Sequence, residues 1–212
     1  MGDRRGLMLT ALLVLASLVC KDLQESAPRI LIQTDLGDIC IEVYSEKAPI
    51  TVKNFLRYVD ENRYKASSFY RVVRLDNQPD NDVKIEVIQG GIGFIESDLR
   101  LPPISHETTR KTGILHKSGT ISIARAEPGT ASSEIFICVG DQPELDFGGR
   151  RNPDGQGFAA FGSVIKGMEV VHAIHREPAD GQVLTTPVKI LGIRRLKKGA
   201  IFTDSIGDEG SK

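Results

Sequence analysis

Histidine is the commonest metal ligand among the side chains, and the chain has four histidines. His172 and His175 have the H-x-x-H spacing of a metal-binding helix. A metal site needs further ligands in a fitting geometry, so a solvated helix face explains this pair better. His106 and His116 lie in loop-like segments where no carboxylate partner can be assigned. The histidines therefore do not indicate a metal centre.

The glycine-rich and serine-rich segments also fail to match common chemical motifs. The stretches 90–93 and 148–157 lack the strand-turn-helix setting and the Lys-Ser/Thr pair of a phosphate-binding loop. Ser132 and Ser133 lack the spacing of a nucleophile elbow. These segments indicate neither a phosphate site nor a covalent catalyst.

Arg71, in the strand-like run 69–75, is a stronger candidate. A guanidinium is always charged and presents rigid, directed N–H donors that could bind a ligand. The alternative is a surface arginine paired with a nearby carboxylate, which is the usual state of an arginine on a strand. The first interpretation requires elements that hold Arg71 beside a binding surface.

The segments on both sides of Arg71 are typical of short strands joined by turns. Residues 29–34 and 39–43 alternate in polarity, and the turn Asp35-Leu36-Gly37-Asp38 between them predicts a β-hairpin. Further strands are expected over the segments 69–75, 86–89, 120–124, 135–139, 158–164 and 188–193.

Two amphipathic helices are expected among these strands. The first begins near Pro49, which suits a first turn. Its apolar stripe consists of Val52, Phe55, Leu56 and Val59. The second covers residues 168–175 and is expected to bury Met168, Val171 and Ile174. Many short strands with two helices predict a mainly β fold, a closed antiparallel barrel whose ends the helices cover.

The composition fits one ordinary globular domain, which we place at residues 29–196. The 212 residues are 40% hydrophobic and 26% charged, with a formal net charge of −1. No basic run with interleaved aromatic residues appears, so we expect no nucleic-acid partner. Cys40 and Cys138 are expected to be buried free thiols, although a disulfide stays open as an alternative.

The first 20 residues resemble an export signal. Arg4 and Arg5 precede an apolar stretch over 7–20, which suits a signal-peptide core and is shorter than the roughly 20 residues of a spanning helix. We expect a periplasmic or secreted protein; an uncleaved membrane anchor, or a lipoprotein acylated at Cys20, is the alternative. Residues 21–28 would be a linker, and 197–212 a flexible polar tail.

Several sequence runs, in a fixed order, are similar to those of one known family. The runs are Phe69-Tyr70-Arg71-Val72-Val73, Val87-Ile88-Gln89-Gly90-Gly91, 119–124, 132–137 and Phe161-Gly162-Ser163-Val164. They resemble the cyclophilins, and the segment 141–149 is similar to the bacterial members. The resemblance implies an eight-stranded antiparallel barrel capped by two helices, with a groove outside the barrel. It also implies catalysis of rotation about X-Pro peptide bonds without a metal or organic cofactor.

The resemblance assigns a catalytic role to Arg71 and an apolar pocket to the proline ring. Phe136 would form the floor of that pocket. Leu145 and Phe158 would form walls, and Val87 takes the place of a larger apolar residue. Apolar residues in strands are mostly plain core, which is the alternative for each of them.

The resemblance also assigns the remaining groove residues. Gln89 would hydrogen-bond the substrate backbone or hold Arg71 in place. Ala124 and Ala126 would flank the groove where the peptide backbone approaches. Arg125 and Glu134 stand where the family usually has asparagine and glutamine, and we expect them to pair across the groove rim.

Rotation about a peptide bond is opposed by about 18–20 kcal/mol of C–N double-bond character. The prolyl nitrogen gains a lone pair in the twisted amide, so a donor aimed at it binds the twisted state more tightly than either planar state. The expected partners are unfolded or extended polypeptides with X-Pro bonds, and the expected role is folding of exported proteins by a monomer. The alternatives are a proline-peptide-binding module or a scaffold with little turnover.

Overall fold

The computed structural model describes residues 27–93 and 97–197. The predicted leader (1–20), most of the predicted linker (21–28) and nearly all of the predicted tail (197–212) lie outside these residues. No helix within the described ranges is both long enough and apolar enough to cross a membrane.

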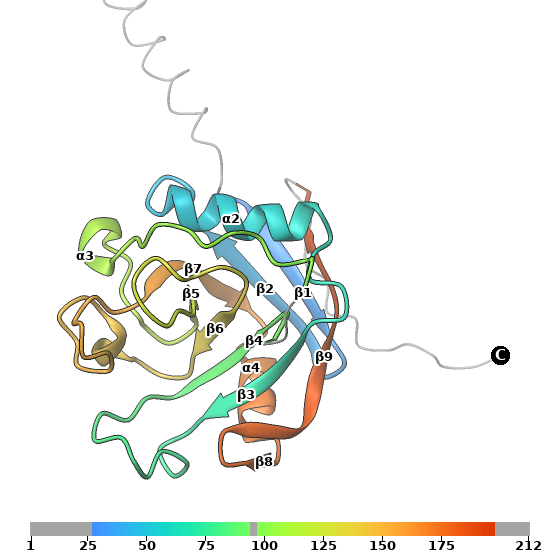
Figure 1. Ribbon diagram of the computed structural model, residues 1–212. Coiled ribbons are helices and arrows are strands. Elements are labelled where there is room, and N and C mark those ends of the chain that lie inside the picture. Colours follow the sequence, from blue (N-terminus) through green and yellow to red (C-terminus); the bar gives the residue numbers. More distant parts are fainter. Residues whose placement is uncertain (1–26, 94–96, 198–212) are drawn as a thin grey trace, which may run out of the picture.

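The fold is a closed antiparallel barrel (Figure 1). Its strands are β1 (Arg29–Thr34), β2 (Gly37–Val43), β3 (Ser68–Val73), β4 (Val87–Gly91), β5 (Thr120–Ile123), β6 (Ile135–Cys138), β7 (Ala159–Lys166) and β9 (Val183–Arg195). They pair in the order β1-β2-β7-β5-β6-β4-β3-β9, and β9 pairs with β1 to close the ring. The predicted fold class is confirmed.

Two helices cover the ends of the barrel. Helix α2 (Pro49–Asp60) crosses one end and α4 (Met168–Arg176) lies at the other (Figure 1). Both bury one apolar side in the core inside the barrel, as their sequence periodicity predicts. On α4 the buried apolar residues are Val170, Val171 and Ile174, and Met168 is partly buried against them.

Three short elements were not predicted because they are too short to carry a periodic pattern. They are helix α3 (Thr109–Thr112), the 3₁₀ turn η1 (Pro143–Leu145) and strand β8 (Ala179–Asp180). Strand β8 forms a hairpin with the start of β9, which begins five residues earlier than the predicted 188–193. The turn of this hairpin carries Gln182, whose side chain reaches Arg71 on β3.

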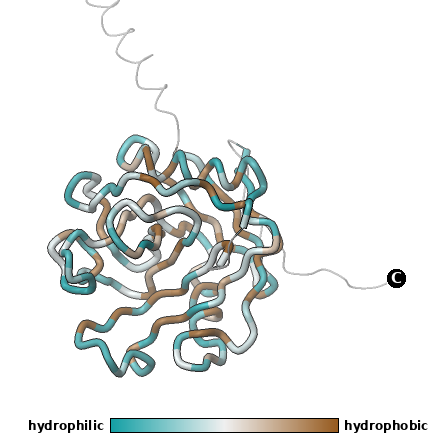
Figure 2. The backbone as a smooth tube through the Cα atoms, in the orientation of Figure 1, coloured by the Kyte–Doolittle hydropathy of each residue, from teal (hydrophilic) through white to brown (hydrophobic). Residues whose placement is uncertain are grey.

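Alternation along the strands separates two apolar clusters. On β6, Ile135 and Ile137 belong to the main core, whereas Phe136 and Cys138 belong to a second cluster. In Figure 2 the strands are mostly brown, which marks hydrophobic residues, and the loops between them are mostly teal, which marks hydrophilic ones. Because neighbouring side chains on a strand point to opposite faces, the second cluster lies on the outer face of the barrel.

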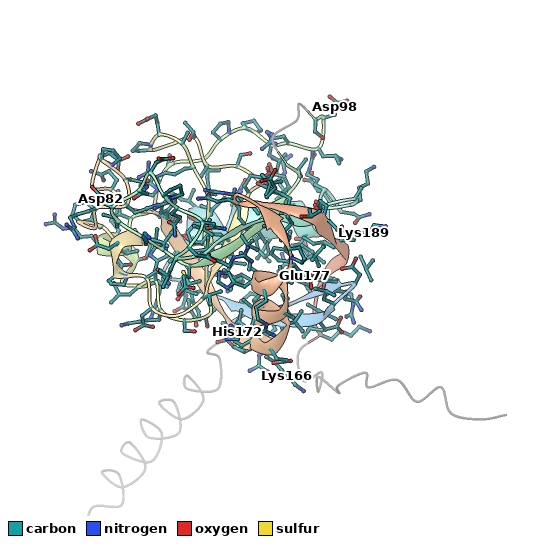
Figure 3. The ribbon with its side chains drawn as sticks, turned by 90° about the horizontal axis from the view of Figure 1, so that it is seen from below. Asp82, Asp98, Lys166, His172, Glu177 and Lys189 are labelled. Atoms are coloured by element: carbon teal, nitrogen blue, oxygen red, sulfur yellow. The ribbon has the colours of Figure 1, made fainter. Side chains whose placement is uncertain are left out.

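The fold tests two predictions about single residues. Cys40 and Cys138 are buried free thiols, as expected. The prediction of a solvated H-x-x-H face is wrong for His175, which is buried with its Nε2 atom 2.9 Å from the carbonyl oxygen of Val73. His172 is half-buried on α4 (Figure 3).

Candidate functional site

Three residues from three neighbouring strands lie in one row on the outer face of the barrel. Arg71 on β3 pairs with Gln89 on β4, and Gln89 pairs with Phe136 on β6. Backbone register alone therefore puts a guanidinium, an amide and an aromatic ring side by side. The three residues are far apart in the sequence, so sequence distance does not indicate that they are direct neighbours on the sheet.

A β-bulge on β3 adds a fourth member to the row. Between Phe69 and Arg71 the register of β3 against β4 shifts by one residue on β3, so Tyr70 is the extra residue of that pair. A bulge re-aims side chains, and here both Tyr70 and Arg71 contact the side chain of Gln89. The phenol oxygen of Tyr70 accepts from Gln89 Nε2 at 3.0 Å and donates to Glu134 Oε2 at 2.7 Å.

The guanidinium of Arg71 is held from two sides. Its Nη1 donates to Gln89 Oε1 at 2.6 Å, and its Nε donates to Gln182 Oε1 at 3.0 Å. Nη2 donates to the same oxygen of Gln182. Burial lowers the pKa of Arg71, and the neighbouring Tyr70 partly opposes that shift. The half-buried group stays a cation because the pKa of an arginine starts so high.

The apolar part of the site is the second cluster. It comprises Val73, Ile85, Val87, Phe136, Cys138 and Leu145, with Ala124 and Phe158 packed against it. The ring of Phe158 meets that of Phe136 edge to face, with centroids 5.2 Å apart. The cluster therefore forms an apolar surface directly beside the guanidinium of Arg71.

One cavity of about 480 Å³ lies over this part of the barrel. Every groove residue assigned from the sequence is on its wall: Arg71, Val87, Gln89, Ala124, Arg125, Ala126, Glu134, Phe136, Leu145 and Phe158. The wall also includes Ile85, Arg100, Thr130, Ser132, Ser133, Arg151 and Asn152. The cavity thus combines an apolar slot, a cation and a polar end.

The predicted pairing of Arg125 with Glu134 is wrong. Arg125 makes a two-pronged ion pair with Asp154, at 2.8 and 2.9 Å, and also donates to the carbonyl oxygen of Gly157. Its guanidinium lies 5.4 Å from the ring centroid of Phe158. Arg125 therefore ties the segment before β7 to the cavity wall and supports Phe158.

Glu134 is a buried carboxylate that the protein itself satisfies. Its oxygens accept from Tyr70, from Ser133 Oγ at 2.8 Å and from the backbone N–H of Gly93, and Arg100 lies 3.6 Å away. Burial nevertheless raises the pKa of this carboxyl, and these donors only partly offset the effect. Glu134 thus orients Tyr70, and through it Gln89.

The raised pKa of Glu134 predicts how stability depends on pH. The folded state favours the protonated carboxyl, so the contribution of Glu134 to stability is full below its ordinary pKa of 4.5 and is lost as pH rises through the folded value. Glutamine does not titrate. The free energy of unfolding of Glu134→Gln, minus that of the wild type, should therefore increase from about pH 4 to about pH 7. Denaturant unfolding of both proteins across this range measures the difference, and a constant or falling difference would contradict it.

His116 lies behind the floor of the site, and its carboxylate partner, which could not be assigned from the sequence, is Asp146. Its Nδ1 lies 2.7 Å from Asp146 Oδ1 and its Nε2 lies 3.1 Å from Ser122 Oγ. The imidazole stacks on Phe136 with ring centroids 5.9 Å apart. Because His116 is buried, this arrangement holds the floor of the cavity and offers no accessible nucleophile.

Sequence reasoning missed Tyr70, Gln182 and Arg151 as parts of the site. Tyr70 stood beside Arg71 in the motif, but only the bulge turns both side chains to one face. Gln182 lies in the β8–β9 turn, 111 residues after Arg71, with no local signal. In the described part of the chain, no group of three or more His, Cys, Asp or Glu residues could hold a metal ion.

Comparison with known proteins agrees with this geometry. The family model "Cyclophilin type peptidyl-prolyl cis-trans isomerase/CLD" matches residues 29–195. A peptidyl-prolyl cis-trans isomerase of Acinetobacter baylyi is 34% identical over 203 residues, which cover 92% of this chain and 96% of that protein. Peptidyl-prolyl cis-trans isomerase B of Escherichia coli is 37% identical over 145 residues, which cover 66% of this chain and 80% of that protein.

The fold also matches solved structures. One is a crystal structure of a Cryptosporidium parvum cyclophilin-type peptidyl-prolyl cis-trans isomerase in the presence of the dipeptide Ala-Pro. It aligns with a TM-score of 0.64 at 23% identity, covering 80% of this chain and 99% of that one. At this identity the match supports the barrel architecture.

Proposed function

Since the chain belongs to the cyclophilin-type peptidyl-prolyl cis-trans isomerase family, we propose that Arg71 is its catalytic group and that its substrates are exported polypeptides. The chain is a peptidyl-prolyl cis-trans isomerase, and it acts on extended segments with an accessible X-Pro bond. The observation that carries the catalytic assignment is the row of Arg71, Gln89 and Phe136 on one wall of the cavity.

The guanidinium of Arg71 supplies the donor that a twisted amide needs. Of its five N–H groups, one on Nε, one on Nη1 and one on Nη2 are used by Gln182 and Gln89. The other two N–H groups have no acceptor among the described residues and are left for the substrate. A donor beside the prolyl nitrogen stabilises the lone pair that appears as amide resonance is lost, and it gains little from the planar forms. The two glutamines fix the guanidinium in advance, so little reorganisation accompanies the reaction.

The apolar cluster supplies binding for the proline ring. Phe136 forms the floor, and Val87, Leu145 and Phe158 form the walls. The ring is held while the carbonyl of the preceding residue rotates. Support for a proline ligand also comes from the crystal structure of the Cryptosporidium parvum relative in the presence of Ala-Pro.

Exchange spectroscopy on a short Pro-containing peptide tests the activity. The wild type should accelerate cis/trans exchange, which is otherwise slow, on the order of tens to hundreds of seconds. A protein that only binds peptide would broaden the signals without accelerating exchange. That result would favour a binding module or scaffold over the proposed mechanism.

The proposed setting, folding of exported proteins outside the cytoplasm, is supported by the apolar run 7–20 behind Arg4 and Arg5. The test is a fusion of residues 1–28 to a reporter that is active only outside the cytoplasm. The fusion should be active, and an otherwise equal fusion with Arg4 and Arg5 replaced by glutamate should lose activity. An inactive first fusion would overturn the proposed setting but not the isomerase mechanism.

Gln182 is proposed as a positioning residue that acts through Arg71. Gln182→Ala removes the acceptor of two guanidinium N–H groups and should lower kcat/KM by about tenfold, whereas Gln182→Glu keeps an acceptor and should lower it less. In an Arg71→Ala background, Gln182→Ala should have almost no further effect, because the group that it orients is gone. Equal losses in both backgrounds would show that Gln182 acts independently of Arg71.

A further inference from the structure

A second guanidinium, that of Arg151, lines the same cavity as Arg71. Arg151 lies in the segment between η1 and β7, and its backbone N–H donates to the carbonyl oxygen of Glu144. Its Nη1 donates to Gln78 Oε1 at 2.9 Å and to the carbonyl oxygen of Val83 at 2.6 Å. The side chain is therefore held at two points and does not hang free in solvent.

The loop between β3 and β4 supplies both of those anchors. Gln78 is only 2% exposed and is fixed by its own hydrogen bonds to Arg74 and Ile85. The same loop carries Asp82 at the edge of the molecule (Figure 3). Neither Asp82 nor Asp80 forms an ion pair with Arg151, and both are exposed. The loop thus orients Arg151 without neutralising it.

The two guanidiniums are close enough to affect each other, and neither has a carboxylate partner among the described residues. Burial lowers the pKa of Arg151, and the charge of Arg71 lowers it further. Glu134, the acidic residue of the cavity wall, is engaged by Tyr70 and Gly93. Asp154, which lies outside that wall, is paired with Arg125. Two like charges beside an apolar slot are unfavourable, and a bound anion would relieve that repulsion.

Hydrogen-bond donors without acceptors gather at the same place. Nε and Nη2 of Arg151 have no acceptor within the described ranges, and two N–H groups of Arg71 are also left over. Asn152, on the same wall, has a buried side-chain nitrogen without a partner. A carboxylate accepts several hydrogen bonds in one plane and matches the fork of a guanidinium. A neutral carbonyl would satisfy fewer donors and would leave both charges uncompensated.

We propose that Arg71 and Arg151 together bind a carboxylate of the substrate beside its proline, so that the enzyme favours acidic X-Pro segments. This proposal rests on the proposed function, because the same slot must hold the proline ring. The carboxylate has two sources, either an acidic side chain next to the proline or the free terminus of a chain that ends in proline. Arg151 is then a specificity-determining residue for the reaction.

Matched peptides test the proposal. One set carries Glu or Gln directly before the proline, a second carries Glu or Gln directly after it, and a third ends in proline as the free acid or the amide. For at least one set, the wild type should show a kcat/KM about five- to tenfold higher for the acid than for its neutral counterpart. Added salt should reduce that ratio, because it screens the charges.

Arg151→Gln should bring the ratio to about one, and Arg151→Lys should keep part of it because a positive charge remains. The matched control is Arg150→Gln, whose side chain is 76% exposed and pairs with Glu144; the control should keep the ratio of the wild type. A wild type without acid preference in any set, or a preference that survives Arg151→Gln, would overturn the proposal. If neutral peptides are still isomerised in an Arg71-dependent manner, only this inference fails and the proposed function stands.

Discussion

Arg71→Ala should reduce kcat/KM for isomerisation of a neutral Pro peptide by about 100-fold or more. Among the described residues of β3, β4 and β6, the guanidinium is the only charged donor in the row beside Phe136, and two of its N–H groups are left over. Its loss removes an interaction that forms mainly in the twisted state, so kcat should fall along with kcat/KM and peptide binding should change less. Exchange spectroscopy at saturating and at low peptide concentration separates these quantities.

Arg71→Lys is the informative companion variant. Lysine keeps the positive charge but lacks the fork that two glutamines hold, so we expect activity between that of the wild type and that of Arg71→Ala. Arg57→Ala serves as a control for removal of an arginine, since this residue lies on α2 and pairs with Glu61. Wild-type rates in Arg71→Ala, with the control also unchanged, would remove the basis of the proposed mechanism.

The barrel could be predicted from the sequence because its signals are local. Alternating strands, the hairpin turn at residues 35–38 and the apolar stripe of α2 each depend on neighbours in the chain. The positions of Arg71, Gln89 and Phe136 came from motif runs similar to the cyclophilins. That the three residues form one row follows only from the register of β3, β4 and β6.

The partners of the charged residues could not be predicted in the same way. Arg125 and Glu134 are close in the sequence and opposite in charge, yet each has better geometry elsewhere. Asp154 offers Arg125 two oxygens at once, and Glu134 is reached by buried donors, among them Tyr70. Which ion pair forms depends on backbone positions set by long-range packing, and these positions cannot be read from the spacing of the charged residues in the sequence. Gln182 could not be predicted for the same reason, because only long-range packing brings it to Arg71.

Phe136→Ala should have the second large effect, and it should act on both stability and substrate binding. The ring is 4% exposed and packs between the imidazole of His116 and the ring of Phe158. Its removal should lower the free energy of unfolding by about 3–5 kcal/mol. It should also raise KM, because the proline ring loses its floor, whereas kcat should fall less because Arg71 keeps its anchors on Gln89 and Gln182.

Phe161 provides the control that separates the two effects, because it is a phenylalanine of the barrel interior and belongs to the main core. Phe161→Ala should lower stability by a similar amount, about 3–5 kcal/mol, and leave KM close to that of the wild type. If either alanine variant does not fold, the leucine variants at both positions keep most of the apolar volume and allow the same comparison. An equal rise of KM in both variants would mean that general loosening of the barrel is responsible. An unchanged KM in a folded Phe136 variant would mean that the proline ring does not rest on Phe136.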